Sequence, residues 1–308
     1  MAELDKGPDA RWTPISLETA EVTRVEWADL SDCRFNARSF RRMIDAWRTN
    51  ASRPTVWTGV EALDALDGSP SLDPTVIIAH AARCGSTLLA QQLGALDATI
   101  IVSEASVIGS ALAAAMEPDG RDERTRTARQ VIRALGRIRF GDEARYVIKL
   151  SSSMIRYLPA LRRVFPSVPV VWLQRRPQEI IESLLRAPSR WLNVGADEPE
   201  RLASAALHKS MLVFMAARAH LADDMVIVDY SELPDAAWRI VCPAIGISPT
   251  SAELDRMRDV SRYHGHTGEP YRPRPVDPLP APVAAAVAEA LDPIYVELDQ
   301  RRIKQRAS

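Results

Sequence analysis

Apolar residues cluster in short runs along most of the chain, and these runs carry the first structural information. Five of them are five or six residues long and rich in β-branched side chains. Such runs are typical of strands that are buried on both faces of a sheet. We therefore predict strands at residues 75–79, 99–103, 146–150, 169–174 and 225–229.

The segments between these runs show a different period, with apolar residues spaced three and four apart. This spacing predicts helices at residues 86–96, 121–138, 153–165, 178–186 and 198–222. Strands that alternate with helices form βαβ units. We predict a three-layer α/β fold, with a mostly parallel sheet of about five strands covered by helices on both faces. Ligands of such folds bind at the carboxyl ends of the strands.

Three other segments have patterns of their own. Residues 1–70 are more polar, with one predicted helix at 37–47, and are interpreted as an extension that packs on an α/β domain at 71–308. Residues 261–282 are rich in Pro, Gly and Arg, which is typical of a long loop, and we interpret them as a lid. Residues 283–305 are predicted to form one closing helix.

Charge and composition narrow the classes of partner. The 308 residues include 39 basic and 40 acidic ones. Because the net charge is only -1, neither a nucleic acid nor an anionic membrane is an expected partner, and an anion site requires a local cluster. The oligomeric state cannot be inferred from the sequence.

Cysteine usage and the first residues bear on localisation. The three cysteines, Cys33, Cys84 and Cys242, are too scattered for a disulfide framework or a zinc site. The first residues, MAELDKGPDARW, lack the apolar core of a signal peptide. No apolar run approaches the roughly 18 residues of a membrane span. We expect a soluble cytoplasmic protein without a metal site.

The segment that follows the first predicted strand has the features of a phosphate-binding loop. Gly85, Ser86 and Thr87 stand at the start of a predicted helix, where unpaired backbone N–H groups and hydroxyls favour an anion. The nucleoside triphosphate loop reads G-x-x-x-x-G-K-[ST]. Here His80 replaces its first Gly and Ser86 replaces its Lys, while Arg83 supplies a cation two residues before Gly85. This arrangement favours one phosphate with an attached group over a triphosphate.

The residues Arg83-Cys84-Gly85-Ser86-Thr87 resemble the 5′-phosphosulfate loop of P-loop sulfotransferases, which commonly reads [KR]-S-G-[ST]-T. Cys84 departs from that pattern but keeps a small side chain. The alternative interpretation is that these residues only cap a helix that follows a strand.

A second segment resembles the 3′-phosphate motif of the same family. Residues 170–186 read VVWLQRRPQEIIESLLR, with Arg175 at a strand end and Ser183 eight residues later. Arginine suits phosphate because its planar guanidinium donates two hydrogen bonds at once. Taken singly, Arg175 could be a solvated strand end. Further along, VDYSEL resembles the family's R-Y-E-D-L segment, so the resemblance covers residues 75–186 and, weakly, the chain up to residue 233.

The resemblance implies a donor, an acceptor and a set of roles. The donor would be 3′-phosphoadenosine 5′-phosphosulfate (PAPS), with adenosine 3′,5′-bisphosphate as product, no metal, and in-line transfer to an acceptor hydroxyl of a small molecule, sugar or peptide tyrosine. Arg83 would offset charge, and Glu104 resembles the base of tyrosylprotein sulfotransferases. Lys149 would contact the transferred sulfate, and His80 is an alternative base. Arg272, in the lid, could close over the nucleotide.

Two other functions remain open at this point. A nucleotide-dependent phosphotransferase could use Asp229 as a strand-end metal ligand, although the loop lysine that such enzymes need is absent. A non-catalytic protein could also retain the fold. The presence of five candidate residues together favours an enzyme: Arg83, Glu104, Lys149, Arg175 and Ser183.

Overall fold

The computed structural model describes residues 8–9, 11–19, 22–36, 38–51, 54–263, 268–272 and 274–307. The chain divides into two compact units. The first comprises Met1–Ile77, Leu93–Leu150 and Tyr157–Val168, and the second comprises Ile78–Gln92, Ser151–Arg156 and Pro169–Ser308. The division of the chain near residue 70 into an extension and a domain stays a prediction.

The principal sheet has five strands in the order β5-β6-β4-β7-β8. Its strands are β4 (Val76–His80), β5 (Thr99–Ser103), β6 (Arg145–Lys149), β7 (Val170–Gln174) and β8 (Val226–Asp229). The pairs β5–β6 and β7–β8 are parallel. Every residue of β4 and β7 is buried, as expected for strands covered on both faces. The α/β class is confirmed, and all five predicted strands lie within one residue of their predicted bounds.

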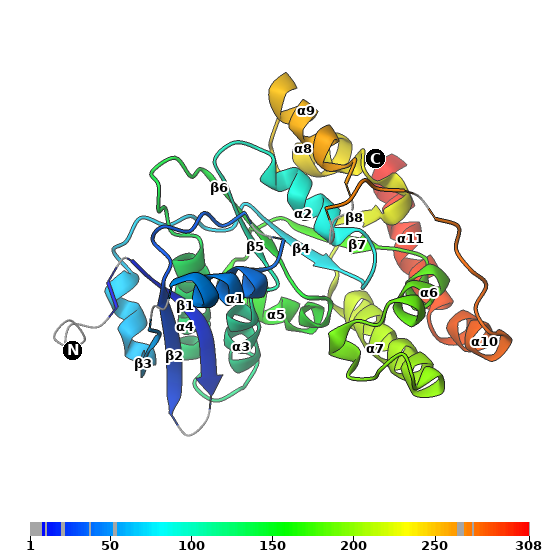
Figure 1. Cartoon of the computed structure of the whole chain (residues 1–308), viewed down its shortest axis with the longest axis horizontal. Coiled ribbons are helices and arrows are strands. Elements are labelled where there is room, and N and C mark those ends of the chain that lie inside the picture. The colour runs from blue at the N-terminus through cyan, green and yellow to red at the C-terminus, as the bar shows by residue number, and fades with distance from the viewer. Residues whose placement is uncertain are drawn as a thin grey trace. The chain divides into compact units, whose positions relative to one another are not determined.

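The first unit begins with an antiparallel sheet that the sequence reading did not predict. Its strands are β1 (Trp12–Thr19), β2 (Thr23–Asp29) and β3 (Val56–Gly59), in the order β1-β2-β3. Helix α1 (Phe40–Ala51) starts three residues later than predicted. Figure 1 shows the three strands side by side in blue, with α1 after β2 along the chain.

The other helices of the first unit pack on this sheet and on one another. They are α3 (Ser106–Ala114), α4 (Arg121–Leu135), α5 (Leu158–Val164) and the 3-10 helix η2 (Val60–Leu66). Helices α3 and α4 contact each other and β1. Gly136, directly after α4, permits a close approach, because a Cβ there would lie 2.6 Å from the carbonyl oxygen of Leu72.

The second unit contains the helices that flank β7 and β8. Helix α11 packs on β8, α7 and α10, and the ring of Trp172 on β7 meets Phe214 on α7 edge to face. Its longer helices are α2 (Ser86–Gly94), α6 (Pro177–Arg186), α7 (Pro199–His220), α9 (Ser251–Val260), α10 (Ala281–Ala290) and α11 (Asp292–Ala307). Its shorter ones are η3 (Ser152–Tyr157), η4 (Arg190–Leu192), η5 (Tyr230–Glu232), η6 (Ala237–Val241) and α8 (Cys242–Ala244).

The prediction of one closing helix over residues 283–305 was wrong, since α10 and α11 are separate helices. Pro293 gives the physical reason. Proline has no backbone N–H and its ring clashes with the preceding turn, so it kinks or breaks a helix at an interior position, whereas the first turn of a new helix accepts it.

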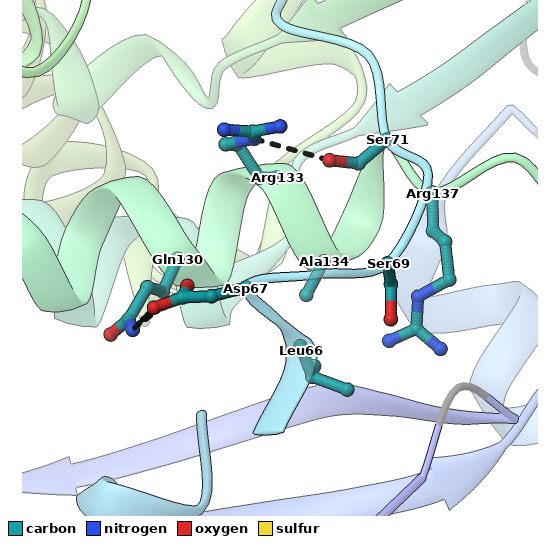
Figure 2. Close-up of a pocket in the computed structure, with 8 residues that line it drawn as sticks. All are labelled: Leu66, Asp67, Ser69, Ser71, Gln130, Arg133, Ala134 and Arg137. Atoms are coloured by element: carbon teal, nitrogen blue, oxygen red, sulfur yellow. Dashed lines mark hydrogen bonds between the residues drawn. The ribbon is translucent and has the colours of Figure 1, made fainter. Parts of the chain in front are cut away.

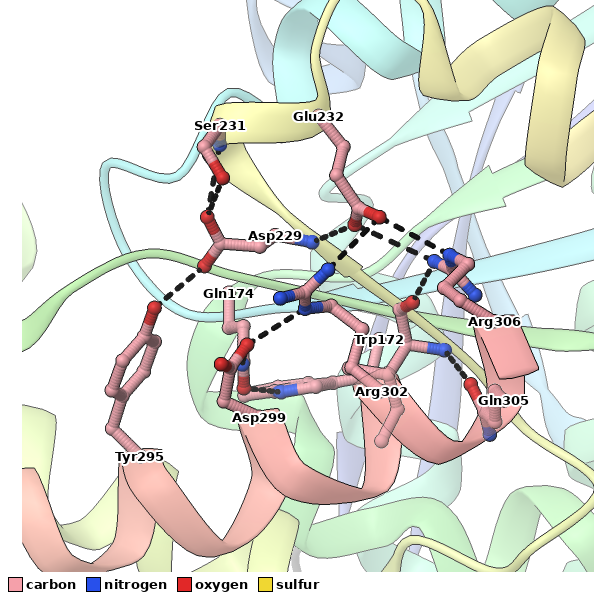
Figure 3. A network of polar contacts seen from close by, with 11 residues as sticks. Trp172, Gln174, Asp229, Ser231, Glu232, Tyr295, Asp299, Arg302, Gln305 and Arg306 are labelled. Atoms are coloured by element: carbon pink, nitrogen blue, oxygen red, sulfur yellow. Dashed lines mark hydrogen bonds and ion pairs between the residues drawn. The ribbon is translucent and has the colours of Figure 1, made fainter.

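Side chains of α11 cover the outer edge of β8, the last strand in the sheet order (Figure 3). Gln305 accepts a hydrogen bond from the N–H of Ile227 at 3.0 Å and donates to the carbonyl of Met225 at 2.6 Å. Arg306 donates to the carbonyl of Ile227 at 2.6 Å. These contacts satisfy backbone groups that an edge strand otherwise leaves open to another chain.

Over the described residues, no helix has both the length and the hydropathy to cross a membrane.

Candidate functional site

The loop between β4 and α2 is held by hydrogen bonds at its base. The N–H of Ala81 donates to the carbonyl of Leu173 on β7 at 2.9 Å, and the thiol of Cys84 donates to the carbonyl of Ala81 at 2.8 Å. Arg83 and Gly85 have φ angles of 56° and 83°, in the left-handed region that favours glycine. The loop leads to Ser86, the first residue of α2, and the first turn of any helix has backbone N–H groups that no carbonyl of the same helix accepts.

Gly85 is closely packed as well as left-handed. A Cβ at this position would lie 2.6 Å from Cδ1 of Leu233 and 3.1 Å from Cδ2 of the Tyr230 ring. No real Cβ tolerates the shorter of these distances without movement of its neighbour. The glycine therefore allows the loop to lie directly against the turn that follows β8.

Arg175 joins the two segments that the sequence singled out. Its Nη1 donates to the carbonyl of Arg83 at 3.1 Å, and its Nε donates to the carboxylate of Glu179 at 2.7 Å. Its guanidinium also lies over the ring of Tyr230, 4.2 Å from the centroid. The end of β7 and the loop after β4 are thus in direct contact within the second unit. Among the described residues, none accepts a hydrogen bond from Nη2 of Arg175.

Ser183 lies on the same face of α6 as the partner of Arg175. It is half-buried and stands four residues after Glu179, and residues four apart on a helix are neighbours on its surface. Arg176, by contrast, is the exposed residue that precedes the helix. Arg175, which precedes α6, is thus tied to Glu179, and Ser183 lies one turn further along the helix.

The side chain of Arg83 reaches the end of the same helix. Its Nη2 donates to the carbonyl of Ala187, while its Nε is buried and has no hydrogen-bond partner within the described part of the chain. Burial, and then the positive charge of Arg186, lower the pKa of Arg83. A buried donor without a partner is costly. An anionic oxygen at the loop would supply the acceptor that Nε lacks.

The described part of the segment 261–282 meets the site through a pair of tyrosines. The hydroxyls of Tyr230 and Tyr271 are 3.0 Å apart, and the N–H of Tyr271 donates to the carbonyl of Arg262 at 2.7 Å. Burial, and next the hydrogen bond with Tyr271, raise the pKa of Tyr230 to about 12, against the opposing effect of Arg175. Arg272 is exposed beside Tyr271. His264 and His266, which belong to the segment interpreted as a lid, lie outside the described residues.

Glu104 and Lys149 form an ion pair in the first unit. Lys149 ends β6 with a side chain that is 2% exposed, and its Nζ contacts the carboxylate of Glu104, which is 41% exposed. The N–H of Glu104 also donates to the carbonyl of Lys149 at 2.7 Å. Glu104 has a φ of 57°, which is uncommon for a residue with a side chain and is a form of strain often found at functional sites. The buried cation that the sequence singled out thus has a carboxylate partner, as its burial requires.

His80 is held within the fold. It is the last residue of β4, it is buried, and its Nδ1 lies 2.7 Å from the carbonyl of Ala81. Because a carbonyl only accepts hydrogen bonds, Nδ1 carries the proton in this contact, and only Nε2 could act as a base. The role of His80 as an alternative base stays a prediction.

Asp229, the candidate metal ligand of a phosphotransferase, is engaged on both oxygens (Figure 3). Oδ1 accepts from the N–H and the hydroxyl of Ser231 at 2.9 and 2.6 Å, and Oδ2 accepts from the hydroxyl of Tyr295 at 3.0 Å. Together with Glu232 it forms a capping box at the start of η5. These contacts give Asp229 a structural role and remove the main support for a phosphotransferase.

The structure adds three groups that the sequence reasoning did not assign to the site: the carboxylate of Glu179, the ring of Tyr230 and the carbonyl of Ala187. A signal existed for Glu179, because an acidic residue four positions from an arginine is a common helical pair. The stacking of Arg175 on Tyr230 joins residues 55 positions apart, and no local pattern reveals it.

The fold and this site define an α/β protein in which a glycine-containing loop and an arginine at a neighbouring strand end meet. Comparison with protein families gives the class a name. Residues 74–248 match the model of the sulfotransferase family. Since the match covers more than half of the 308 residues, the chain belongs to the sulfotransferase family.

Comparison with solved structures finds similarity to sulfotransferases from several bacteria. Sulfotransferase STF9 from Mycobacterium avium is 16% identical, with a TM-score of 0.48, and the match covers 83% of this chain and 82% of that one. Sulfotransferase STF1 from Mycobacterium tuberculosis H37Rv is 17% identical, with a TM-score of 0.43 and coverages of 70% and 75%. A sulfotransferase from Alicyclobacillus acidocaldarius is 14% identical, with a TM-score of 0.42 and coverages of 75% and 96%. No curated protein matches the sequence.

Proposed function

We propose that this protein is an enzyme that transfers a sulfuryl group from PAPS to an acceptor hydroxyl. One observation carries the proposal: the Nη1 of Arg175 donates to the carbonyl of Arg83, so the two phosphate motifs of the family are in contact. A donor with phosphates at its 3′ and 5′ positions needs two separate anion sites near each other. Both proposed anion sites belong to the second unit. One follows β4 and the other follows β7, which are neighbouring strands of the principal sheet.

The donor roles follow from the chemistry of each segment. The backbone N–H groups and hydroxyls at Ser86 and Thr87, with Cys84 and Gly85 in the loop, are assigned to the 5′-phosphosulfate. Arg83 is assigned to the same group, because its unpartnered Nε is a donor without an acceptor.

At the other end of the donor, Arg175 and Ser183 are assigned to the 3′-phosphate. Nε of Arg175 donates to Glu179, and its Nη1 donates to the carbonyl of Arg83. These two hydrogen bonds orient the guanidinium, and its Nη2 can donate to a phosphate oxygen. Arg272 is exposed next to Tyr271, whose hydroxyl contacts that of Tyr230. We assign Arg272 to the nucleotide as well.

The catalytic roles are assigned to the ion pair and to Arg83. In the proposed transfer the acceptor oxygen forms a bond to sulfur while the bond from sulfur to the 5′-phosphate oxygen breaks. Glu104, which contacts Nζ of Lys149, takes the proton of the acceptor hydroxyl. Arg83 and Lys149 offset the negative charge of the transferred group and of the leaving phosphate. No metal is assigned a role.

Two further features belong to the proposal. The acceptor is a hydroxyl-bearing small molecule, a sugar or a peptide tyrosine, and the cytoplasm is the proposed location.

Calorimetric titration with adenosine 3′,5′-bisphosphate tests the donor site. Arg175→Ala should weaken binding about tenfold to 150-fold, which corresponds to the roughly 1.5–3 kcal/mol of a hydrogen bond to a charged group. Arg176→Ala is the matched control, because that side chain is the exposed neighbour, and it should bind as the native chain does. Equal affinity for the native chain and Arg175→Ala would exclude Arg175 from the donor site.

Sulfuryl transfer itself is tested with PAPS and a phenolic acceptor. Glu104→Gln should lower kcat by about 100-fold or more if Glu104 is the base, while the affinity for adenosine 3′,5′-bisphosphate stays unchanged. Native kcat in Glu104→Gln would exclude Glu104 as the base. A native chain without activity would favour the non-catalytic alternative.

A further inference from the structure

A small pocket lies at the carboxyl end of α4, within the first unit (Figure 2). It is narrow and partly open to solvent. Its walls come from the end of η2, the segment that follows it, and the last turns of α4. The lining residues are Leu66, Asp67, Ser69, Ser71, Gln130, Arg133, Ala134 and Arg137.

Arg137 is the unusual member of this lining. Its side chain is 3% exposed, and its Nη2 donates to the carbonyl of Trp12 at 2.9 Å. No carboxylate of the described ranges lies within ion-pair distance of it. Burial lowers the pKa of Arg137, although the charge of Asp9 acts in the opposite direction. A buried charge without an ionic partner is costly, and a guanidinium has four further N–H groups to donate.

The other polar groups near Arg137 include donors. Ser69 is half-buried, and Figure 2 shows its hydroxyl on the same side of the pocket as the Arg137 guanidinium. The hydroxyl of Ser71 is turned away from Arg137 and toward Arg133 (Figure 2), and its oxygen accepts from Nε of Arg133 at 3.1 Å.

The carboxylate of Asp67 also lines the pocket, and an anion could bind only where this carboxylate does not face it. Asp67 accepts from the side-chain amide of Gln130, with both oxygens at 3.1 Å. Figure 2 shows this carboxylate turned toward Gln130, on the opposite side of the pocket from Arg137. The pocket is therefore divided, with an acidic side at Asp67 and a basic side at Arg137 and Ser69.

The basic side is built on rigid backbone. The N–H of Leu72 donates to the carbonyl of Gly136 at 2.9 Å, and the N–H of Ile138 donates to the carbonyl of Pro70 at 3.0 Å. These bonds fix the segment that carries Ser69 and Ser71 against the segment that carries Arg137. The donors are held in place before any ligand binds, which lowers the entropic cost of binding.

We propose that this pocket binds a small tetrahedral oxyanion, sulfate or phosphate, through the guanidinium of Arg137 and the hydroxyl of Ser69. The planar guanidinium matches two oxygens of such an anion. The anion is either free or the terminal group of an ester. The site shares no residue with the donor loop, so it stands whether or not the proposed transfer activity is correct.

Thermal denaturation of the full chain tests the site, with sodium sulfate compared with sodium chloride at equal ionic strength. Saturating sulfate should raise the Tm of the native chain by roughly 2–4 °C, since a ligand that binds only the folded state stabilises it. Arg137→Gln should lose the part of this shift that arises at the pocket. Arg83→Ala is the control for sulfate bound at the donor loop, and it should keep a shift that Arg137→Gln lacks.

A second variant covers the case in which Arg137→Gln fails to fold. Ser69→Asp places a carboxylate beside Arg137, so it should raise the Tm without sulfate and abolish the same part of the sulfate shift. Methyl sulfate and methyl phosphate form the ester arm of the experiment. A shift with free anions alone identifies a free anion as the ligand, and a shift with the esters as well identifies a terminal group. Absence of a shift in the native chain, or an undiminished shift in Arg137→Gln or Ser69→Asp, would overturn the proposal.

Discussion

Substitution of Gly85 tests whether the loop and the arginine at the end of β7 form one site. An alanine at this position has two costs. A φ of 83° is unfavourable for any residue with a Cβ, by about 1–2 kcal/mol. The Cβ would also lie 2.6 Å from the Leu233 side chain and 3.1 Å from the Tyr230 ring, and crowding of this kind in a packed region costs roughly 1–3 kcal/mol.

Gly246 provides a control that has only the first of these costs. Its φ is 71°, and nothing lies within 4 Å of a Cβ built there. Gly246→Ala should therefore lower the free energy of unfolding by about 1 kcal/mol, after the gain from a less flexible unfolded chain. Gly85→Ala should lower it by roughly 1–3 kcal/mol more. Urea unfolding measures this difference.

The functional consequence follows from the stacking of Arg175 on Tyr230. If the Tyr230 ring shifts to accommodate the new methyl group, the guanidinium 4.2 Å from its centroid shifts with it. Loss of one charge-assisted hydrogen bond to the donor would raise the donor KM about tenfold or more. Gly246→Ala should leave this KM unchanged. Native donor KM in Gly85→Ala, with the same stability loss as Gly246→Ala, would refute the reasoning.

Three further predictions concern ionisable groups. The folded-state pKa of Tyr230 is about 12, against an ordinary value of 10.0. The unfolded chain therefore loses this proton first, and the free energy of unfolding falls as pH rises between these values. Tyr230→Phe should make this fall less steep, as measured by urea titrations at several pH values. Glu104→Leu leaves Lys149 buried without a partner and should cost roughly 3–5 kcal/mol, whereas Lys149→Met leaves a carboxylate that water reaches and should cost less; equal losses by urea unfolding would contradict this asymmetry. Tyr295→Phe removes the hydrogen bond to Asp229 and should lower stability by about 1 kcal/mol, whereas an unchanged urea midpoint would show that this bond contributes nothing.

The strands of the principal sheet could be predicted because burial on both faces leaves a continuous apolar run. The strands β1 and β2 were missed for the opposite reason. Their burial patterns mix buried, half-buried and exposed positions, and the register of β1 shifts between Pro14 and Ser16. A polar strand interrupted by an irregularity has no clear period of two. Helix α3 was missed because its sequence, SVIGSALAA, is small and apolar on most sides.

The residues of the site could be predicted where their motif is local in the sequence, but their contacts with distant segments could not. Residues near Gly85 and near Arg175 could be singled out because each motif lies within one short segment beside a strand. The contacts that orient Arg175 could not, because the carbonyl of Arg83 and the ring of Tyr230 are far from it along the chain. Backbone carbonyls carry no sequence signal, since every residue has one.

Arg175 makes both of these long-range contacts. The effects of Gly85→Ala and Arg175→Ala on the donor KM should therefore depend on each other. If Gly85→Ala raises the donor KM by displacing Tyr230 and hence Arg175, the effect needs the guanidinium to be present. In an Arg175→Ala background, Gly85→Ala should then add little to the donor KM, although its cost in unfolding free energy remains. Substitutions that act through a shared contact are not additive, whereas independent ones are. Additive effects of the two substitutions on the donor KM would mean that the loop contacts the donor without help from Arg175.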